Sequence, residues 1–378
     1  MTYDFDTAPD RRGTDSNKWS RYAGDVLPMW VADMDFAVAP AIVDALRERL
    51  AHPVFGYAAA RDRLRERIVA HCAARYGWTI AVDDIVFLPG VEPGFNMALK
   101  ALAAPGDGVV VNTPVYRPIL NAPGHWDLTR VDLPFDAANR IDPDARDAAL
   151  ARSSVYLLCN PHNPVGKVFA RDELAAIAHA CIAHDAWIVS DEIHCDLLFD
   201  GRVHVPIASL DPEVAARTVT LMAASKTWNI AGLKTAFAIV PDAALRKRFE
   251  ATRLGMVDSV NMFGLAATEA ALAHGEPWRR ALIEQLTRNR DHLVATVRER
   301  FPDIRVAPPE ATFLAWLDCS RLGIADPQAF FLERGRVAFS AGADFGRGHA
   351  AWLRVNFGCT RAVLDDGLAR MERALASR

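Results

Sequence analysis

The fold is indicated most clearly by three segments, "SSVYLLCN" (153–160), "RDELAAIAHACIAHD" (171–185) and "AWIVSDEI" (186–193). The two outer segments are short apolar runs rich in strand-forming residues, which is typical of strands buried on both faces. The middle segment repeats apolar residues at helical spacing, at Leu174, Ile177, Ala178, Cys181 and Ile182. A strand, helix, strand unit predicts a parallel sheet covered by helices.

Further apolar runs extend this sheet. They are "TVTLMAAS" (218–225), "GDGVVVNTP" (106–114) and "KTAFAIVP" (234–241). In open α/β sheets, ligands bind beyond the carboxyl ends of the strands. The polar residues that follow three of the runs include Asn163, Asp191 and Lys226. The sequence therefore predicts an amide, a carboxylate and an amine at one edge of the sheet.

The C-terminal part has the pattern of a second, smaller domain. A helical stretch (279–300) leads to the strand candidates "ATFLAWLDCS" (311–320) and "WLRVNFGC" (352–359), and a closing helix begins near residue 361. Because a helix of that length often bridges two domains, we place a boundary near residue 275. The predicted parts are an N-terminal segment of the small domain (1–45), a large domain (46–275) and the remainder of the small domain (276–378).

The composition narrows the class of protein. The 378 residues are 51% hydrophobic and 24% charged with a formal net charge of −4, which is ordinary for a globular protein. Basic residues are dispersed and no apolar run reaches the length of a bilayer, so we expect neither nucleic-acid nor membrane contact. The polar start "MTYDFDTAPDRRGTDSNKW" (1–19) lacks a signal-peptide pattern, and we expect a cytoplasmic protein. The six cysteines form no C-x-x-C pair, which predicts neither disulfides nor a metal site.

Eight fragments, taken in their order and spacing, resemble one family. They are "RRGTDSNKW" (11–19), "LPMWVADMDF" (27–36), "FGY" (55–57), "TPVY" (113–116), "NPHNPVGKVF" (160–169), "SDEIHCDL" (190–197), "SKTWNIAGLK" (225–234) and "WLRVNFGC" (352–359). The chain resembles the fold-type I pyridoxal 5'-phosphate (PLP) enzymes of the class I/II aminotransferase superfamily, and more narrowly their C–S β-lyase (cystathionine β-lyase) branch. The resemblance implies PLP as cofactor and an α/β fold with a mostly parallel sheet, helices on both faces and a smaller α+β domain.

The resemblance implies a role for each residue that matches the family pattern. Lys226 is expected to carry the aldehyde of PLP and to remove the Cα proton of the substrate, since burial and neighbouring charges tune an amine for such work. Asp191 is expected beside the ring nitrogen, because a carboxylate there keeps that nitrogen protonated. Glu192 alternates to the other face of its strand and is assigned no chemistry.

Three residues are expected around the rest of the cofactor ring. Asn163 matches the asparagine that hydrogen-bonds the phenolic oxygen of the ring. His194 lies where many aminotransferases carry a tyrosine that touches the same oxygen, with a purely structural histidine as the alternative. Tyr116 resembles the aromatic residue that stacks on the ring, with a core tyrosine as the alternative.

The phosphate is expected at the start of the helical pattern "LPGVEPGFNMALKAL" (88–102), because backbone N–H groups at a helix start bind anions. The residues expected there are Gly90, Val91, Glu92 and Lys234, and Ser225 is expected to bind the cofactor next to Lys226. Lys234 stands where many relatives have arginine, and it supplies charge without a bidentate fork. Tyr57 resembles the tyrosine that reaches the phosphate of a neighbouring subunit, which implies a homodimer with shared active sites.

The substrate implied by the resemblance is a small amino acid. Arg354 matches the arginine that binds its α-carboxylate, a planar bidentate task, and Ala32 is expected to offer backbone nearby. The predicted reaction is β-elimination from L-cystathionine or a related cysteine S-conjugate to a thiol, pyruvate and ammonia. Amino transfer to a 2-oxo acid is the first alternative, because the same residues could perform it. A non-catalytic binding or regulatory protein is the second.

Overall fold

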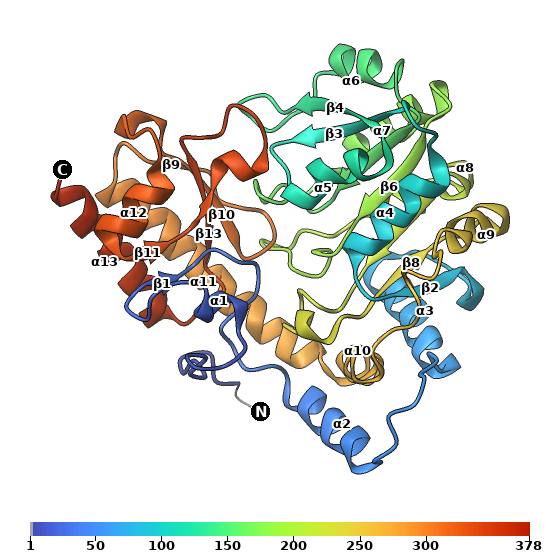
Figure 1. Cartoon of the computed structure of the whole chain (residues 1–378), viewed down its shortest axis with the longest axis horizontal. Helices are drawn as coiled ribbons and strands as arrows, with labels where there is room; N and C mark the ends of the chain where they lie inside the picture. Colours follow the sequence, from blue (N-terminus) through green and yellow to red (C-terminus); the bar gives the residue numbers. More distant parts are fainter. Residues whose placement is uncertain (1–2) are drawn as a thin grey trace.

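A computed structural model describes residues 3–378 and has a seven-stranded sheet at its centre (Figure 1). The order is β2 (Ile85–Leu88), β8 (Ala236–Ile239), β7 (Thr218–Met222), β6 (Trp187–Asp191), β5 (Val155–Cys159), β3 (Gly108–Thr113) and β4 (Thr129–Pro134). Only β8 runs against its neighbours. The predicted mostly parallel sheet and its five predicted strands are confirmed, with ends at most three residues inside the predicted runs.

The two strands that the sequence did not indicate lie at the edges of this sheet. β2 is only four residues long, which is too short for a clear periodicity. β4, "TRVDLP", alternates buried and exposed residues, and its charged members obscure the apolar pattern. Edge strands are often short or charged, because such features discourage pairing with other chains.

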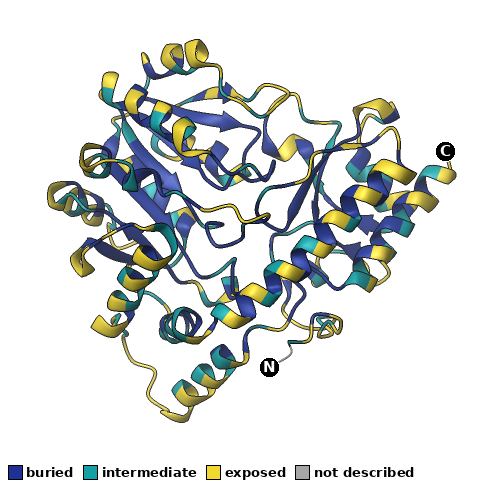
Figure 2. Cartoon of the chain, turned by 180° about the vertical axis from the view of Figure 1, so that it is seen from behind, coloured by how far each residue is buried: buried dark blue, intermediate teal, exposed yellow. Residues whose placement is uncertain are grey.

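Helices cover both faces of the large sheet, as predicted. One face packs on α4 (Val91–Leu102), α5 (Arg117–Asn121) and α9 (Ala243–Ala251), and the other on α6 (Pro143–Leu150), α7 (Arg171–Ala183) and α8 (Pro212–Ala216). α3 (Asp62–Tyr76) and α10 (Met262–His274) pack near β2 and β8. The central strands are buried between these layers, apart from the partly exposed Trp187 at the start of β6 (Figure 2). Each buried Val, Leu or Ile contributes roughly 1.5–3 kcal/mol through removal from water.

A second, antiparallel sheet lies beside the first. Its order is β12 (Ser340–Ala341), β13 (Trp352–Asn356), β10 (Leu314–Asp318) and β9 (Arg305–Val306). It packs with α11 (Glu276–Arg300), α12 (Pro327–Gly335) and α13 (Arg361–Ala376). The predicted long helix, both predicted strands and the closing helix are therefore confirmed.

The N-terminal segment joins this second layer. It contains α1 (Asn17–Ser20), β1 (Leu27–Pro28) and α2 (Pro40–Ala51). β1 pairs in parallel with β11 (Val337–Ala338), and Met29, Met34 and Phe36 pack in the same core as α11 and α13. The boundaries near residues 45 and 275 stay predictions. Within residues 3–378, no helix has both the length and the hydropathy to cross a membrane.

Candidate active site

A cavity of about 1000 Å³ lies beyond the carboxyl ends of β5, β6 and β7 and reaches the second sheet at β12 and β13. It brings together every predicted site residue except Tyr57. These lining residues are Ala32, Gly90, Val91, Glu92, Tyr116, Asn163, Asp191, His194, Ser225, Lys226, Lys234 and Arg354. The position agrees with the rule that open α/β sheets bind ligands at this edge.

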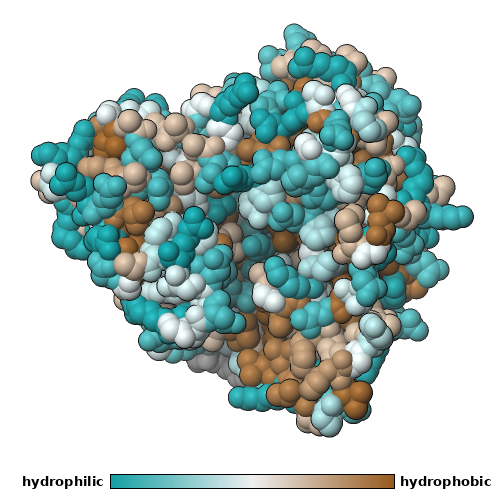
Figure 3. All heavy atoms as spheres, in the orientation of Figure 1, coloured by the Kyte–Doolittle hydropathy of each residue, from teal (hydrophilic) through white to brown (hydrophobic). Residues whose placement is uncertain are grey.

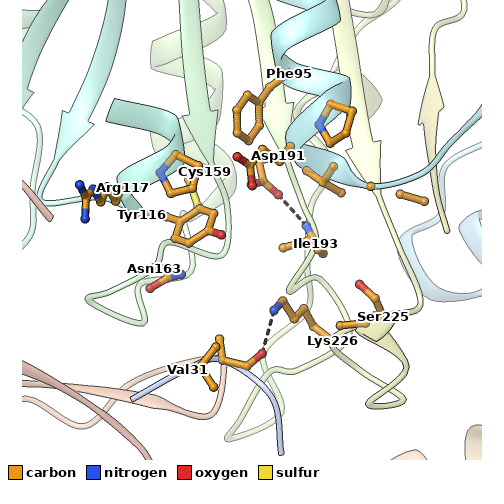
Figure 4. Close-up of a pocket in the computed structure, with 18 of the residues that line it drawn as sticks. Val31, Phe95, Tyr116, Arg117, Cys159, Asn163, Asp191, Ile193, Ser225 and Lys226 are labelled. Atoms are coloured by element: carbon orange, nitrogen blue, oxygen red, sulfur yellow. Dashed lines mark hydrogen bonds between the residues drawn. The ribbon is translucent and has the colours of Figure 1, made fainter. Parts of the chain in front are cut away.

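Lys226 lies just after β7, with its ammonium group directed into the cavity (Figure 4). Its Nζ donates a hydrogen bond of 2.7 Å to the carbonyl oxygen of Ala32. Burial and the nearby Arg354 cation lower the pKa of Lys226 to about 8, while Asp33 and Asp191 oppose the shift. A substantial fraction of this amine is therefore neutral near physiological pH, and a neutral amine can act as a nucleophile or a base.

Asp191 ends β6 and faces the same cavity as Lys226 (Figure 4). Its side chain is buried, and its Oδ1 accepts a hydrogen bond of 3.1 Å from the backbone N–H of Ile193. Burial raises the pKa of Asp191 to about 7, with a smaller increase from Glu192 and opposing effects of Ile193 and Lys226. A cation brought against this carboxyl group would favour its ionised form.

Arg354 is a buried cation for which no described residue provides a carboxylate partner. Its Nη1 donates to Asn163 Oδ1 at 3.1 Å, and its Nη2 donates to the Trp30 carbonyl at 2.9 Å and to Ser340 Oγ at 3.2 Å. Its Nε is buried and has no hydrogen-bond partner in the described chain. Burial lowers the pKa of Arg354 to about 10. Because an unpaired buried charge is costly, the site favours an anionic ligand.

His194 and Tyr116 form part of the wall between these groups. His194 is 2% exposed, and its Nδ1 has no partner among residues 3–378. Burial, with the Lys226 and Arg354 cations, lowers the pKa of His194 to about 3, so its ring is neutral. The Tyr116 ring points into the cavity (Figure 4), and its backbone N–H donates to the Asn163 carbonyl at 3.0 Å. The ring is half-buried, and its stacking on the cofactor stays a prediction.

The start of α4 provides the anion-binding features that the sequence predicts. Gly90 is the N-cap, and the N–H groups of Val91 and Glu92 have no partner in the described chain. Pro93 at the next position has no N–H, so these two groups are the free donors of the first turn. Ser225 and Lys234 line the same cavity, and Lys234 forms no ion pair with any of residues 3–378. The cluster is chemically suited to a phosphate.

Two asparagines that sequence reasoning missed hold the loop of residues 30–36, which carries Ala32. Asn229 donates from Nδ2 to the Met34 and Phe36 carbonyls and accepts from the Met34 N–H at 2.9 Å. Asn356 Nδ2 donates to two other carbonyls of the loop, at 2.6 and 2.7 Å. Both lie inside the fragments that carry the family resemblance, but their partners are more than 190 positions away.

A buried ion pair fixes the same loop from its other side. Lys18 Nζ and Asp35 Oδ2 are 2.7 Å apart, and both side chains are 1% exposed. Arg11 and Trp19 donate to the other oxygen of Asp35 at 2.8 and 2.9 Å. The fragment of residues 11–19 therefore acts on the site indirectly, by positioning the loop whose carbonyl accepts from Lys226.

Glu192 lies on the opposite side of β6 from Asp191, as the strand alternation predicts. It is fully buried, with Oε2 2.6 Å from His204 Nε2. Its Oε1 accepts from Ser190 Oγ at 2.8 Å and from the Ile207 N–H at 3.3 Å. These bonds tie residues 204–207 to the strand that carries Asp191.

Tyr57 lies outside the cavity. It is 99% exposed on a segment (52–61) without regular structure, between α2 and α3. Leu50, Val54 and Phe55 are also more than half exposed, and apolar side chains gather at this lower end of the molecule (Figure 3). Such a patch often marks a surface that contacts another chain.

Comparisons with known proteins show the family to which this chain belongs. Residues 25–371 match the family model described as aminotransferase class I and II. The cystathionine beta-lyase PatB of Bacillus subtilis (strain 168) is 39% identical over 98% of this chain and 100% of its own length. The crystal structure of OvoB matches with a TM-score of 0.96 and 41% identity over 100% of both chains. A PLP-bound C–S lyase from Staphylococcus hominis matches with a TM-score of 0.94 and 30% identity over 99% of this chain and 98% of that one.

Proposed function

Since this chain belongs to the aminotransferase class I and II family, we propose that it is a PLP-dependent C–S β-lyase. Its substrate is L-cystathionine or a related cysteine S-conjugate, and its products are a thiol, pyruvate and ammonia. The observation that carries the proposal is one cavity in which Lys226 and Asp191 face a common space beside Arg354, an unpaired buried cation. The similarity to PatB, named as a cystathionine beta-lyase, supports the choice of reaction.

The residues present are suited to PLP. Lys226 would attach its aldehyde, Asp191 would pair with its ring nitrogen, and Tyr116 would cover the face of its ring. Asn163 and the neutral His194 would contact its phenolic oxygen. Gly90, Val91, Glu92, Ser225 and Lys234 would hold its phosphate. When bound, PLP withdraws electrons from the Cα atom of an attached amino acid and so acidifies the Cα proton.

The chain's own residues then divide the work of β-elimination. Arg354 binds the α-carboxylate and orients the substrate. Lys226, whose pKa is lowered to about 8, takes the Cα proton as a neutral amine. The electron pair of the Cα–H bond forms a Cα–Cβ double bond, and the electrons of the C–S bond leave with sulfur as the thiolate. Hydrolysis of the released enamine yields pyruvate and ammonia.

We further propose a cytoplasmic homodimer with shared active sites. The exposed patch of Leu50, Val54, Phe55 and Tyr57 supports a contact with a second copy. Tyr57, which is remote from the cavity of its own chain, would reach the phosphate site of the partner. Six unpaired, buried cysteines fit a reducing compartment.

The reaction is tested by incubating the PLP-loaded protein with L-cystathionine in the absence of any 2-oxo acid. We expect pyruvate and ammonia to accumulate over many turnovers. The matched control adds 2-oxoglutarate to the same mixture and should leave the rate unchanged. A single stoichiometric change in the cofactor absorbance, reversed only by an oxo acid, would instead identify an aminotransferase.

Replacing Arg354 with glutamine should raise KM for L-cystathionine and lower kcat/KM by about 10²-fold, because a bidentate charge-assisted contact is lost. Arg354→Lys should recover only part of this loss, since a lysine lacks the planar fork. The exposed Arg334 offers a matched control, and Arg334→Gln should leave the kinetics unchanged. An unaltered KM in Arg354→Gln would show that Arg354 does not bind the substrate.

A further inference from the structure

An ion pair at the rim of the cavity has no role in the reaction described above. Arg117, the first residue of α5, donates from Nη1 to Asp344 Oδ1 at 3.1 Å. Asp344 belongs to the short 3-10 helix η6 (Gly342–Phe345) that follows β12. Both residues line the cavity, and their side chains are 64% and 47% exposed. The pair therefore joins the two layers of the molecule at the mouth of the site.

Phe345 places this rim pair next to the predicted carboxylate site. The Phe345 carbonyl accepts from the Val115 N–H at 2.8 Å, which joins η6 to the segment before α5. The Phe345 ring lies 4.8 Å from the guanidinium carbon of Arg354. Asp344 is also close enough to favour the charged form of Arg354, against the lowering of its pKa by burial. A substrate held by Arg354 would thus extend along one wall toward the rim.

The side chains of the rim pair can form further hydrogen bonds. The side chains of Arg117 and Asp344 share one hydrogen bond, and neither side chain forms a hydrogen bond with any other residue among 3–378. The rim pair therefore presents one guanidinium group and one carboxylate to a ligand.

We propose that this rim binds the amino-acid head of the leaving thiol, with its ammonium group at Asp344 and its carboxylate at Arg117. The inference rests on the proposed lyase function and names its substrate class: cysteine S-conjugates whose sulfur substituent ends in a zwitterionic amino acid. An exposed ion pair contributes little stability, so a zwitterionic ligand can separate Arg117 from Asp344 at small cost. The carboxylate of the ligand then pairs with the guanidinium group, and its ammonium group pairs with the Asp344 carboxylate. An alkyl substituent on sulfur makes neither contact.

The test compares kcat/KM for L-cystathionine with kcat/KM for S-ethyl-L-cysteine, in the wild type and in Asp344→Asn and Arg117→Gln. Each variant should lower the value for L-cystathionine by about five- to tenfold, mainly through KM, as expected for a partly exposed charge contact. The value for S-ethyl-L-cysteine should change by less than about twofold. Arg347→Gln, on the same exposed loop but outside the cavity, is the matched control.

A purely structural link between the two layers predicts a different pattern. In that case both substrates would lose activity equally, and the charge-swapped double variant Arg117→Asp with Asp344→Arg would recover both. On the present proposal the double variant stays poor on L-cystathionine, because the carboxylate and the guanidinium have exchanged places. Equal losses, recovery by the swap or no loss at all would overturn the rim site alone. A wild type that releases pyruvate from neither substrate would overturn the lyase function and the rim site together.

Discussion

Replacing Lys226 with alanine is expected to abolish pyruvate release from L-cystathionine, with a fall in kcat of at least about 10³-fold. The substitution removes the amine that would hold the cofactor and take the Cα proton. We also expect the absorbance band of the covalently attached cofactor to be lost, because the covalent link needs an amine. Lys234→Ala is the matched control, because it removes another lysine of the same cavity. It should weaken cofactor affinity and still permit turnover at saturating PLP.

The pKa of Lys226 adds a pH dependence to this prediction. The pKa is lowered to about 8 by burial and by Arg354, so the neutral fraction of the amine rises as pH increases through that value. From pH 7 to pH 9 this fraction increases by about tenfold. The rate at which cofactor-free protein captures PLP, followed by absorbance, should rise with it. A rate that is flat or falling over this range would contradict the role of Lys226 as the attacking amine.

Replacing Asp191 with asparagine is expected to lower kcat by about 10²–10³-fold while the protein still binds PLP. An amide has the size of the carboxyl group but no charge to keep the ring nitrogen protonated. Absorbance spectra and kcat of the loaded variant provide the measurement. Turnover close to that of the wild type would show that Asp191 does not act on the ring nitrogen.

The same substitution should have the opposite effect on the cofactor-free protein. Burial raises the pKa of Asp191 in the folded chain to about 7, above its ordinary value of 3.8. The folded state therefore binds this proton more tightly than the unfolded state, and stability is lost as pH rises from about 4 to about 7. Asp191→Asn avoids that loss and should be more stable than the wild type above pH 7, by at most about 4 kcal/mol. Both proteins should be similar near pH 4.

Glu192→Gln is the matched control for this stability measurement. Glu192 is adjacent in sequence and equally buried, but it is paired with His204 at 2.6 Å. Glutamine has one acceptor oxygen where glutamate has two, so either His204 or the Ser190 hydroxyl and the Ile207 N–H lose their present acceptor, and we expect destabilisation of about 1–3 kcal/mol. Urea unfolding of the three cofactor-free proteins would separate these effects. A Glu192→Gln variant that is more stable than the wild type would show that the hydrogen bonds of Glu192 do not repay the free energy of burying its carboxyl group.

The elements of the fold could be predicted from the sequence wherever their pattern is local. The strands that end near Asp191 and Lys226 are continuous apolar runs, and α11 is a long amphipathic stretch, so each can be recognised without its partners. β2 and β4 could not be recognised in this way, because β2 is too short and the charged residues of β4 obscure its apolar period. The order of the strands follows from long-range pairing, which no local pattern contains.

The chemical groups of the cavity could be predicted from local patterns, because strand ends and a helix start bring Asp191, Lys226 and the Val91 N–H to one edge of a parallel sheet. The hydrogen-bond partners and pKa values of those groups depend on contacts that exist only in the folded chain. Lys226 donates to the carbonyl oxygen of Ala32, which lies 194 positions away in the sequence. Arg117 donates to Asp344, which lies 227 positions away. The shifted pKa values of Asp191 and Lys226 have the same origin, since burial and neighbouring charge exist only after folding brings distant segments together.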